Sequence, residues 1–474
     1  MPFRIRNFWS KFLSCCVLFA LFATFLLKFG IDTKQVREFE LSEAKIVYSI
    51  NKSYLDINKI LDDKINDLDE IKLSQLKINE QIETNTFSVY KEVYSLERNL
   101  KKSNEKYMIL EYTNVFFAPK FCSKSSEEIF NSQIEKCEFN NCEYTCDKLK
   151  FLSSADALIF HQRDVEAEFE LKYNNFDEWF HRTLQIPFKT PEEKLKNNPE
   201  QIWILWNDEA TKINSAFNSI SKLFNWTLSF KTDAEIFEGS YGFFLPNKHI
   251  SESDLIRYKE EIHENFVKRE NAILWFVSNC KSKLRSRVAL EISQYYPLHI
   301  YGKCDLSKDF TESEIKAKYP YLKVFSNEKC SRDSECELEK FQSYKYYLAF
   351  ENTNCTDYVT EKIWKSLNKH MIPIALQPNR QSYQSFSIPS KSFIHLEDYD
   401  FNVRQLTNHL NSINQDFSLY YKYLKWTYVY LKTHNDGKET EPHRMCQLCK
   451  KLNTFKKRIS YKRIADFFND RCLS

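Results

Sequence analysis

The sequence predicts an α/β protein with two α/β domains that follow a membrane anchor and a helical stem. Three observations lead to this prediction. An apolar run without charge lies close to the N-terminus, and a heptad pattern without proline follows it. Further along, short apolar runs of strand length alternate with helix-like segments, which is typical of parallel sheets covered by helices.

The composition limits the functions that the chain can have. Its 474 residues carry a formal net charge of +3, with 42% hydrophobic and 28% charged residues. This balance is ordinary for a globular protein and argues against a surface built for nucleic acid. Only five glycines occur, which excludes the glycine-rich phosphate loops of dinucleotide-binding and P-loop proteins. Any bound nucleotide is therefore held in another way.

Residues 12–31 are predicted to be an uncleaved transmembrane signal anchor. The run from Phe12 to Leu27 contains no charge, and as a helix it spans roughly 24 Å, which suits the thin bilayer of the early secretory pathway. Basic residues precede it, so the positive-inside rule places residues 1–11 in the cytosol and the rest of the chain in the lumen. A cleaved signal peptide is the alternative, but no small-x-small cleavage site follows the run.

Residues 32–106 are predicted to form a helical stem. No proline occurs between Pro2 and Pro119, and a seam of positions recurs at alternating spacings of three and four, with the polar Lys64, Gln75 and Asn85 at three of them. The apolar positions of this seam are Tyr54, Ile57, Leu61, Leu68, Ile71, Ile78 and Ile82. The pattern favours a coiled coil that joins two copies of the chain into a homodimer, and a single extended helix is the alternative.

Cysteine usage agrees with an oxidising compartment. Two of the 14 cysteines lie in the anchor and the others follow it, and an even number beyond an anchor predicts disulfides. Cys142 and Cys146, together with Cys446 and Cys449, have the spacing of a four-cysteine zinc site, which is the alternative. The candidate N-glycosylation sites are Asn51, Asn225 and Asn354.

The luminal body is predicted to contain a first domain at 107–265, a second at 266–400 and a C-terminal segment at 401–474 that packs back on them. In the first domain, the predicted strands are 157–160, 202–206 and 226–230. The polar segments 161–164 and 207–209 follow two of these strands. They are candidate site residues because ligands of open α/β sheets collect beyond the carboxyl ends of the strands.

The second domain gives a clearer pattern. Its predicted strands are 272–277, 298–302, 346–350 and 372–376, and a helix is predicted at 358–368. Strand, helix and strand in this order predict a right-handed parallel crossover. Residues 351–357 are rich in helix N-cap types. A helix N-terminus at the carboxyl edge of the sheet is therefore expected to attract a phosphate without a glycine loop.

The same segments resemble the α1,3-fucosyltransferases, a glycosyltransferase family that uses GDP-fucose. The most specific block runs from Phe350-Glu-Asn352 through Asp357-Tyr-Val-Thr-Glu361-Lys362 to Pro373-Ile-Ala. Weaker matches lie at 155–161, 224–229, 275–280, 300–304, 392–395 and 446–449, so the resemblance covers about residues 107–450. It implies the GT-B arrangement, in which two Rossmann-like domains face a cleft. The first would bind the acceptor and the second GDP-fucose, and fucose would be transferred with inversion.

The resemblance also implies the catalytic groups. Glu209 aligns with the family's candidate base, a carboxylate that removes a proton from the attacking sugar hydroxyl. The Ser-Pro that follows this base in the family is Ala-Thr here, and Asp208 is the nearest substitute. Lys362 and Arg285 match the cations that meet the charge developing on the leaving diphosphate, and Arg287 is the alternative to Arg285.

The donor-binding residues implied by the resemblance are Asn279, Arg285, Tyr301, Asn352, Tyr358, Glu361 and Lys362. Glu361 is expected to accept hydrogen bonds from the ribose hydroxyls, although a surface pair with Lys365 at i,i+4 is the alternative. No Asp-x-Asp lies between the predicted strands. The sequence therefore requires no metal ion and no tightly bound cofactor, and stimulation by a divalent metal stays open.

The resemblance implies a disulfide pattern as well. It pairs some of Cys137, Cys142 and Cys146 with Cys446 and Cys449. Cys280 is expected to pair with Cys304, since both follow adjacent strands. Asn354 lies beside the expected donor site, and both it and Asn225 are expected to be poorly glycosylated.

The sequence therefore predicts a type II Golgi membrane protein whose luminal body transfers fucose to O3 of N-acetylglucosamine in a glycan of a glycoprotein or glycolipid. The alternatives within the family are transfer to the core N-acetylglucosamine of N-glycans or to a protein hydroxyl. A non-catalytic Golgi scaffold is a hypothesis of another class, which the intact Glu361, Lys362, Asn352 and Arg285 oppose. A coiled-coil tether with a cytosolic body would be excluded by a glycan on Asn51.

Overall fold

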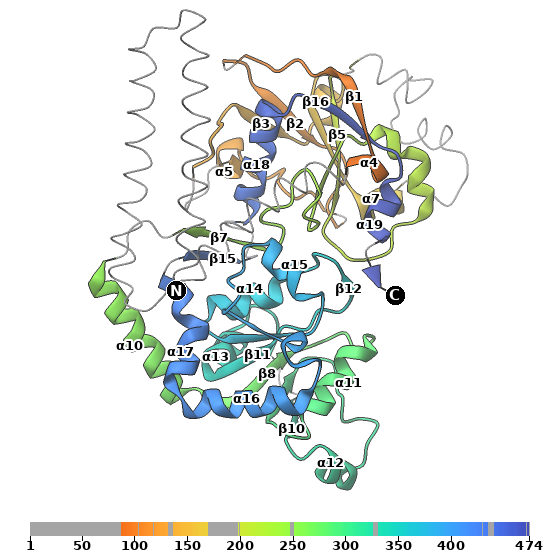
Figure 1. Cartoon of the computed structure of the whole chain (residues 1–474). Helices are drawn as coiled ribbons and strands as arrows, with labels where there is room; N and C mark the ends of the chain where they lie inside the picture. The colour runs from red at the N-terminus through yellow and green to blue at the C-terminus, as the bar shows by residue number, and fades with distance from the viewer. Residues whose placement is uncertain are drawn as a thin grey trace, which may run out of the picture. The chain divides into compact units, whose positions relative to one another are not determined.

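A computed structural model gives the fold of the protein (Figure 1). It describes residues 87–102, 104–116, 118–130, 136–168, 198, 200–246, 251–325, 330–428, 430–434, 440–470 and 472–473, all within one compact unit that spans Gln75–Ser474. The predicted anchor, the predicted stem up to residue 86 and Asn51 lie outside the described residues. Among the helices that are described, none is long and apolar enough to cross a membrane.

The first domain is built on a parallel sheet of five strands in the order β3-β2-β4-β5-β6. These strands are β2 (Tyr107–Glu111), β3 (Cys142–Thr145), β4 (Ala157–His161), β5 (Ile202–Asn207) and β6 (Trp226–Ser229). Every residue of β4, β5 and β6 is buried, as expected for strands covered on both faces. The three strands predicted in this domain are confirmed.

Helices close both faces of the first sheet. The 3-10 helix η1 (Ser215–Leu223) and α19 (Ile464–Asn469) pack on one face, and α5 (Ser126–Phe130) and α18 (Thr440–Thr454) pack on the other. The short helices α6 (Lys148–Phe151) and α7 (Gln162–Glu168) follow β3 and β4. The end of the chain therefore supplies part of the core of the first domain.

The second domain is a parallel sheet of six strands in the order β10-β9-β8-β11-β13-β14. Its strands are β8 (Glu270–Phe276), β9 (Leu298–Tyr301), β10 (Leu322–Phe325), β11 (Tyr344–Leu348), β13 (Ile372–Ala375) and β14 (Ile394–His395). The four strands predicted here are confirmed with shifts of a residue or two at their ends, whereas β10 and β14 were not predicted.

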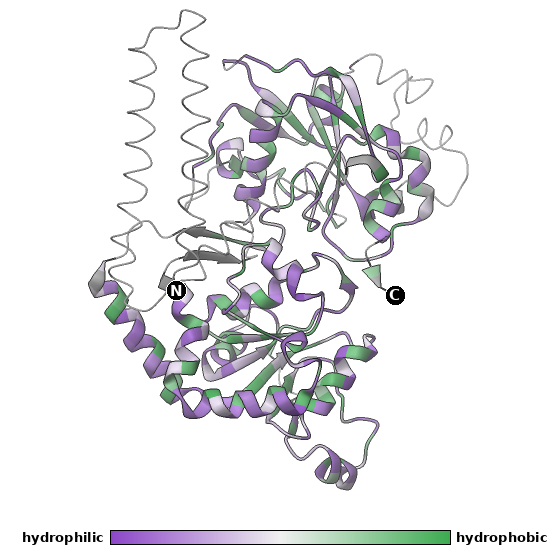
Figure 2. Cartoon of the chain, in the orientation of Figure 1, coloured by the Kyte–Doolittle hydropathy of each residue, from purple (hydrophilic) through white to green (hydrophobic). Residues whose placement is uncertain are grey.

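Amphipathic helices cover both faces of this second sheet (Figure 2). One face packs against α10 (Glu252–Lys268), α11 (Lys283–Ile292), α16 (Val403–Gln415) and α17 (Phe417–Leu424), and the other against α13 (Glu335–Ser343), α14 (Glu361–Asn368) and α15 (Arg380–Ser385). The small helix α12 (Glu312–Lys318) lies between β9 and β10 along the chain. Helix α14 begins three residues later than predicted, because Thr360 before it has an extended backbone, the conformation of an N-cap residue.

The structure corrects the end of the predicted stem. After a single helical turn, α4 (Phe87–Tyr90), residues Lys91–Glu97 form strand β1, which pairs antiparallel with β16 (Lys457–Tyr461). The side chain of Lys91 is buried against Glu235, with the two charged groups 2.7 Å apart. Valine and tyrosine in this segment favour a strand, and the backbone of β16 supplies the partner that a helix would leave unpaired.

The chain passes from the first domain to the second and back through two strands that pair with each other. Strand β7 (Gly242–Pro246) leaves the first domain, and β15 (Tyr430–His434) returns to it, in antiparallel register. A second short pair, β12 (Asn354–Cys355) with β17 (Cys472–Leu473), joins the second domain to the end of the chain.

Six disulfides connect the cysteines of the described body. Two of the three candidate cysteines pair with the C-terminal cysteines as expected, in the bonds Cys137–Cys446 and Cys142–Cys449, and the expected Cys280–Cys304 bond is confirmed. Cys146 pairs instead with Cys122, and the remaining bonds are Cys330–Cys336 and Cys355–Cys472. The alternative of a four-cysteine zinc site is wrong, since all four of its sulfurs are in disulfides.

The amide of Asn225 is already used inside the fold. Its Oδ1 accepts a hydrogen bond from the backbone N–H of Trp203 at 2.9 Å, and its Nδ2 donates to the carbonyl of Ile459 at 2.9 Å. A glycan on Asn225 would break both contacts, so the fold opposes glycosylation there. Asn354 is half-buried in β12.

Gly242, at the start of β7, has no space for a side chain. A Cβ added there would lie 2.2 Å from Cδ2 of Trp364, a buried residue of α14. Gly242→Ala is therefore expected to lower the free energy of unfolding by about 1–3 kcal/mol, measured by chemical denaturation. In a Trp364→Leu background, Gly242→Ala should lower the free energy of unfolding by less. An equal loss in both backgrounds would show that Trp364 is not what excludes a side chain at residue 242.

Candidate active site

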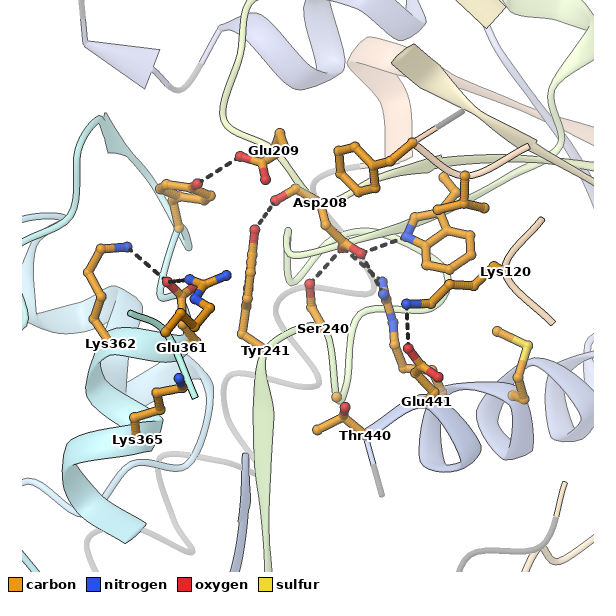
Figure 3. A pocket seen from close by; sticks show the side chains of 18 of the residues that line it. Lys120, Asp208, Glu209, Ser240, Tyr241, Glu361, Lys362, Lys365, Thr440 and Glu441 are labelled. Atoms are coloured by element: carbon orange, nitrogen blue, oxygen red, sulfur yellow. Dashed lines mark hydrogen bonds and ion pairs between the residues drawn. The ribbon is translucent and has the colours of Figure 1, made fainter. Parts of the chain in front are cut away.

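A cavity of about 490 Å³ is lined by side chains of both domains (Figure 3). The first domain contributes the loops that follow β2 and β5, residues 239–241 and the start of α18. The second domain contributes the loop after β11, the start of α14, and residues 332–333. The carboxyl ends of parallel strands from two sheets thus meet at one space, where ligands of such sheets bind.

Glu209 lies in this cavity two residues after the end of β5. Its Oε2 accepts a hydrogen bond from the hydroxyl of Tyr358 at 3.2 Å. Burial raises the pKa of Glu209, and the nearby carboxylates of Asp208 and Glu361 add to the rise, while the Tyr358 hydroxyl and the Lys362 ammonium oppose it. A carboxylate with a raised pKa is suited to accept a proton near neutral pH.

Asp208, the substitute for Glu209, is held in a different way. One carboxylate oxygen accepts from Nε1 of Trp206 and Nη1 of Arg444, each at 2.6 Å, and the other accepts from Ser240 at 2.6 Å and Nη2 of Arg444 at 3.0 Å. Its backbone carbonyl accepts from the Tyr241 hydroxyl at 2.5 Å. Asp208 therefore fixes the loop, which leaves Glu209 as the better candidate base (Figure 3).

The second domain places a lysine and a carboxylate at the start of α14. Nζ of Lys362 lies 2.7 Å from Glu351 and 3.7 Å from Glu361. Burial alone would lower the pKa of Lys362, but these two carboxylates outweigh it and raise the pKa. Lys362 therefore remains a cation at the cavity wall, where an anionic ligand group would meet it.

Glu361 is kept ionised by its neighbours. Burial alone would raise the pKa of Glu361, but Lys362 and Arg332 outweigh it and lower the pKa. Arg332 donates from Nη2 at 2.8 Å, and it lies in the loop closed by the Cys330–Cys336 disulfide. Lys365 instead pairs with Asp333 at 2.8 Å, so the structure does not form the alternative i,i+4 pair of Glu361.

Asn352 has an acceptor atom that the folded chain leaves unused. It lines the cavity, and its Oδ1 is buried without a hydrogen-bond partner. Buried polar atoms are nearly always paired, so an unpaired one at a cavity wall suits a ligand that donates a hydrogen bond. Of the residues predicted from sequence, the structure therefore brings five to this cavity: Glu209, Asn352, Tyr358, Glu361 and Lys362.

The other three predicted residues lie outside the cavity lining. Arg285 is buried on α11, where its guanidinium donates to the carbonyls of Phe350 at 3.2 Å and Asn279 at 2.5 Å. Tyr301 is buried with its ring centroid 4.6 Å from that of Phe325. The Asn279 side chain is exposed and accepts from the backbone N–H of Lys281 at 2.9 Å.

Arg287 faces away from this group. It is exposed on α11 and lines a separate cavity of about 620 Å³ beside the loop that contains Leu306. Of the two arginines, Arg285 is therefore the one beside the carboxyl ends of β8 and β11.

The first-domain wall contains residues that the sequence did not single out. Phe116 is 45% exposed at the cavity with a φ of 53°, an uncommon conformation for a bulky residue. Its backbone N–H donates to Asp164 at 2.9 Å, and its ring lies 4.6 Å from the ring of His161. Lys120 pairs with Glu441 at 2.6 Å. The suspected segment 161–164 thus supports the wall of the cavity.

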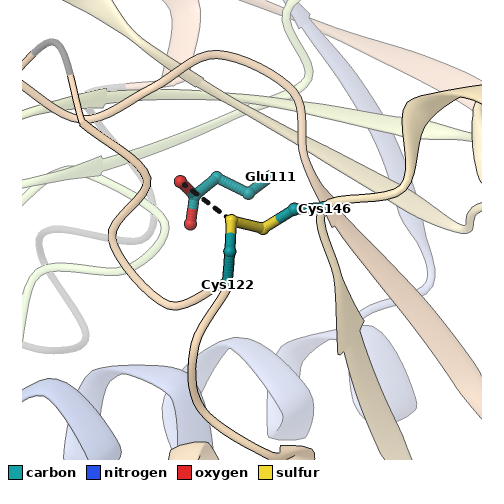
Figure 4. A group of neighbouring side chains, drawn as sticks. All are labelled: Glu111, Cys122 and Cys146. Carbon is teal, nitrogen blue, oxygen red and sulfur yellow. Dashed lines mark hydrogen bonds between the residues drawn. A yellow bond between two sulfur atoms is a disulfide. The ribbon is translucent and has the colours of Figure 1, made fainter.

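Glu111, Cys122 and Cys146 are the group that comes nearest to a metal site among the described residues (Figure 4). The two sulfurs form a disulfide, so neither is a thiolate that could bind a metal. The Glu111 carboxylate accepts from the backbone N–H groups of Lys120 at 2.8 Å and Phe121 at 3.2 Å, and from the Tyr144 hydroxyl at 2.9 Å. These contacts explain the group as a structural support of the loop after β2.

Two parallel α/β domains that share a cavity define a GT-B-like fold, which is typical of glycosyltransferases. Residues 104–242 match the family model described as fucosyltransferase, N-terminal, and residues 266–467 match that of glycosyltransferase family 10 (fucosyltransferase), C-term. The chain therefore belongs to the family 10 fucosyltransferases.

The curated relatives that the chain resembles are fucosyltransferases. Alpha-(1,3)-fucosyltransferase fut-6 of Caenorhabditis elegans is 27% identical over 333 residues, which cover 69% of this chain and 72% of the relative. Alpha-(1,3)-fucosyltransferase 4 of Bos taurus is 28% identical over 229 residues, 48% of this chain and 50% of the relative. A crystal structure of an alpha1,3-fucosyltransferase with GDP-fucose is 15% identical, with a TM-score of 0.37, over 76% of this chain and 95% of that chain.

The ion pair between Asp208 and Arg444 gives a prediction for stability. The Arg444 side chain is 5% exposed, so Arg444→Met leaves a partly buried carboxylate without its cation and should cost about 3 kcal/mol of unfolding free energy. Asp208→Asn added to Arg444→Met should recover part of the loss. Chemical denaturation of the two single variants and the double variant measures the coupling, and strictly additive costs would disprove it.

Proposed function

We propose that the protein is an α1,3-fucosyltransferase that moves L-fucose from GDP-β-L-fucose to O3 of N-acetylglucosamine in a glycoprotein glycan. One observation carries the proposal. A single cavity has the half-buried carboxylate of Glu209 on one wall and Glu361 with Lys362 on the other, within a family 10 fold. The names of the relatives supply the linkage, since they are called alpha-(1,3)-fucosyltransferases.

The proposed reaction is a direct displacement with inversion. Oxygen O3 of the acceptor attacks C1 of fucose while the bond from C1 to the GDP oxygen breaks. Glu209 takes the proton of the attacking hydroxyl. The hydrogen bond from the Tyr358 hydroxyl holds Oε2 of Glu209 in place. The negative charge that develops on the β-phosphate of GDP is met by Lys362, which its two carboxylate neighbours keep protonated.

The remaining donor contacts follow from the chemistry of GDP. Glu361, kept ionised, accepts hydrogen bonds from the ribose hydroxyls of GDP-fucose, and Oδ1 of Asn352 accepts a hydrogen bond from another group of GDP-fucose. Arg285 supports the loops after β8 and β11 through their carbonyls. A direct contact of Arg285 with phosphate, and contacts of Asn279 and Tyr301 with the donor, stay predictions. No metal ion is needed for these roles.

We also propose the location and assembly that the sequence predicts. The protein is a type II Golgi membrane protein with its body in the lumen, and two copies join through the stem. The six disulfides of the body support an oxidising compartment. Core N-acetylglucosamine of N-glycans and a protein hydroxyl are the alternative acceptors.

The first test is release of GDP from GDP-fucose by the full chain, produced in a secretory pathway so that its disulfides form. The acceptor panel contains N-acetyllactosamine, an N-glycan core and a folded glycoprotein. Acceptor-dependent release is expected, and Glu209→Gln should lower kcat by about 10³-fold. Glu264→Gln, a surface carboxylate on α10, is the matched control and should retain full activity.

The outcomes separate the hypotheses. No release with any acceptor, together with GDP binding that Lys362→Met weakens, would retain the donor site and reject the acceptors of the panel. Absence of both release and GDP binding would reject the enzyme and favour the scaffold.

The pH dependence of kcat gives a second prediction. Glu209 acts only as the carboxylate, so activity should fall as the pH drops through the pKa of Glu209, which burial holds above that of an ordinary glutamate. The charge of Asp208 contributes to this rise, so Asp208→Asn should move the acid limb of the profile to lower pH. An acid limb that stays in place in Asp208→Asn, or moves to higher pH, would contradict the assignment.

A further inference from the structure

The end of the chain is bonded to the loop that leads into α14. Strand β17 pairs antiparallel with β12, and Cys472 forms a disulfide with Cys355. Cys355 is fully buried, and Tyr358, the partner of Glu209, follows three residues later. The second-domain side of the cavity is therefore covalently joined to the last residues of the protein.

The same terminal segment is anchored in the first domain. The apolar side chains of α19 belong to the core beneath the first sheet, and they are Ile464, Ala465, Phe467 and Phe468. The amide of Asn469 exchanges two hydrogen bonds of 2.9 Å with the backbone of Ile213. Nζ of Lys231 donates to the carbonyl of Phe467 at 2.6 Å. Residues 464–473 thus form a strap from the first domain to the second.

Two weaker contacts join the same loop to the first domain. Oδ2 of Asp357 accepts from the backbone N–H of Thr232 at 3.2 Å and from its hydroxyl at 2.8 Å. The Tyr358 hydroxyl donates to Glu209, and its ring lies 5.0 Å from that of Phe230. Asp357 and Tyr358 lie two and three residues after Cys355. The position in which the Cys355–Cys472 disulfide holds the loop therefore also places these two side chains.

The strap adds a second connection to the one formed by the domain crossings. Two-domain enzymes commonly open and close by rotation about their crossings, which here are β7 and β15. Within this unit, Figure 1 draws the β7–β15 pair at the left and the β12–β17 pair, near the C-terminus, at the right. A rotation that widened the cavity would have to stretch the strap or unpack α19 from its core.

We propose that residues 464–473 are a covalent strap that sets the width of the cleft, with Cys355 and Cys472 as positioning residues that hold Tyr358 against Glu209. The inference deepens the proposed function and depends on it for its catalytic readout. A base and a donor loop held at a fixed separation need no closing motion before transfer, which is the benefit of preorganisation.

The test compares the full chain with Cys355→Ala/Cys472→Ala. In the variant, kcat for the best acceptor should fall by about 10- to 100-fold, because Tyr358 is no longer held against Glu209. Amides of residues 352–361 should exchange hydrogen at least about tenfold faster in the variant, as the strap no longer limits local opening. This exchange readout needs no activity.

The matched control is Cys137→Ala/Cys446→Ala. With Cys142–Cys449 in place, this disulfide closes only a short additional loop, so in the loop-entropy model its loss should cost less stability than loss of Cys355–Cys472. Helix α18 stays held by Cys142–Cys449. The control should keep kcat and the exchange rates of 352–361, so an equal loss of kcat in both variants would show a general stability effect and overturn the proposal.

Other outcomes are equally informative. Unchanged kcat and unchanged exchange in the strap variant would overturn the proposal. A wild type that binds GDP but transfers no fucose would reject the proposed function, whereas the exchange of 352–361 would still test the strap. If the strap variant does not fold, hydrogen exchange of the wild type tests the proposal instead. Residues 352–358 and 464–470 should then exchange as one cooperative unit, and clearly different opening free energies would refute the strap.

Discussion

The buried ion pair between Asp208 and Arg444 is the contact on which the geometry of the cleft depends. It joins the loop after β5 to α18, across 236 residues of sequence. Either charge without the other would be costly in this desolvated position, so the loop and the helix keep one relative placement. Two disulfides hold α18 to the first domain. The position of Glu209, the next residue after Asp208, is therefore set by a helix near the end of the chain.

The two walls of the cavity are stabilised by different means. On the second-domain wall, short-range contacts within one continuous segment prepare the charges, because Glu351 and Glu361 keep Lys362 protonated before any ligand arrives. On the first-domain wall, the chemistry depends on long-range contacts that reach Glu209 through Asp208. The two walls meet at the hydrogen bond from the Tyr358 hydroxyl to Glu209.

Local patterns explain which features the sequence could predict. The apolar runs at 202–206 and 272–277 predict strands because each is buried on both faces, and the block 350–362 predicts the second-domain wall because its residues are contiguous. Arg444, Ser240 and Tyr241 leave no comparable pattern, since only the tertiary fold brings them to Asp208. The end of the stem was mispredicted because absence of proline does not distinguish a helix from β1, whose partner β16 lies more than 350 residues later. The spacing of Arg285 in the sequence predicted its position near the donor side of the second sheet. It did not predict that the side chain contacts backbone carbonyls.

The first domain takes its core from both ends of the described chain, whereas the second is continuous from α10 to α17. This order has a consequence for biosynthesis, because chains fold as they are made and N-terminal domains usually fold first. Here the second domain can complete its sheet while the first still lacks α18, β16 and α19. The thiols of Cys137 and Cys142 must wait for Cys446 and Cys449 to leave the ribosome. Nascent chains should therefore hold an unfinished first domain until residues 440–469 have been made, and a chain that stops before residue 440 should lose the first domain while keeping the second.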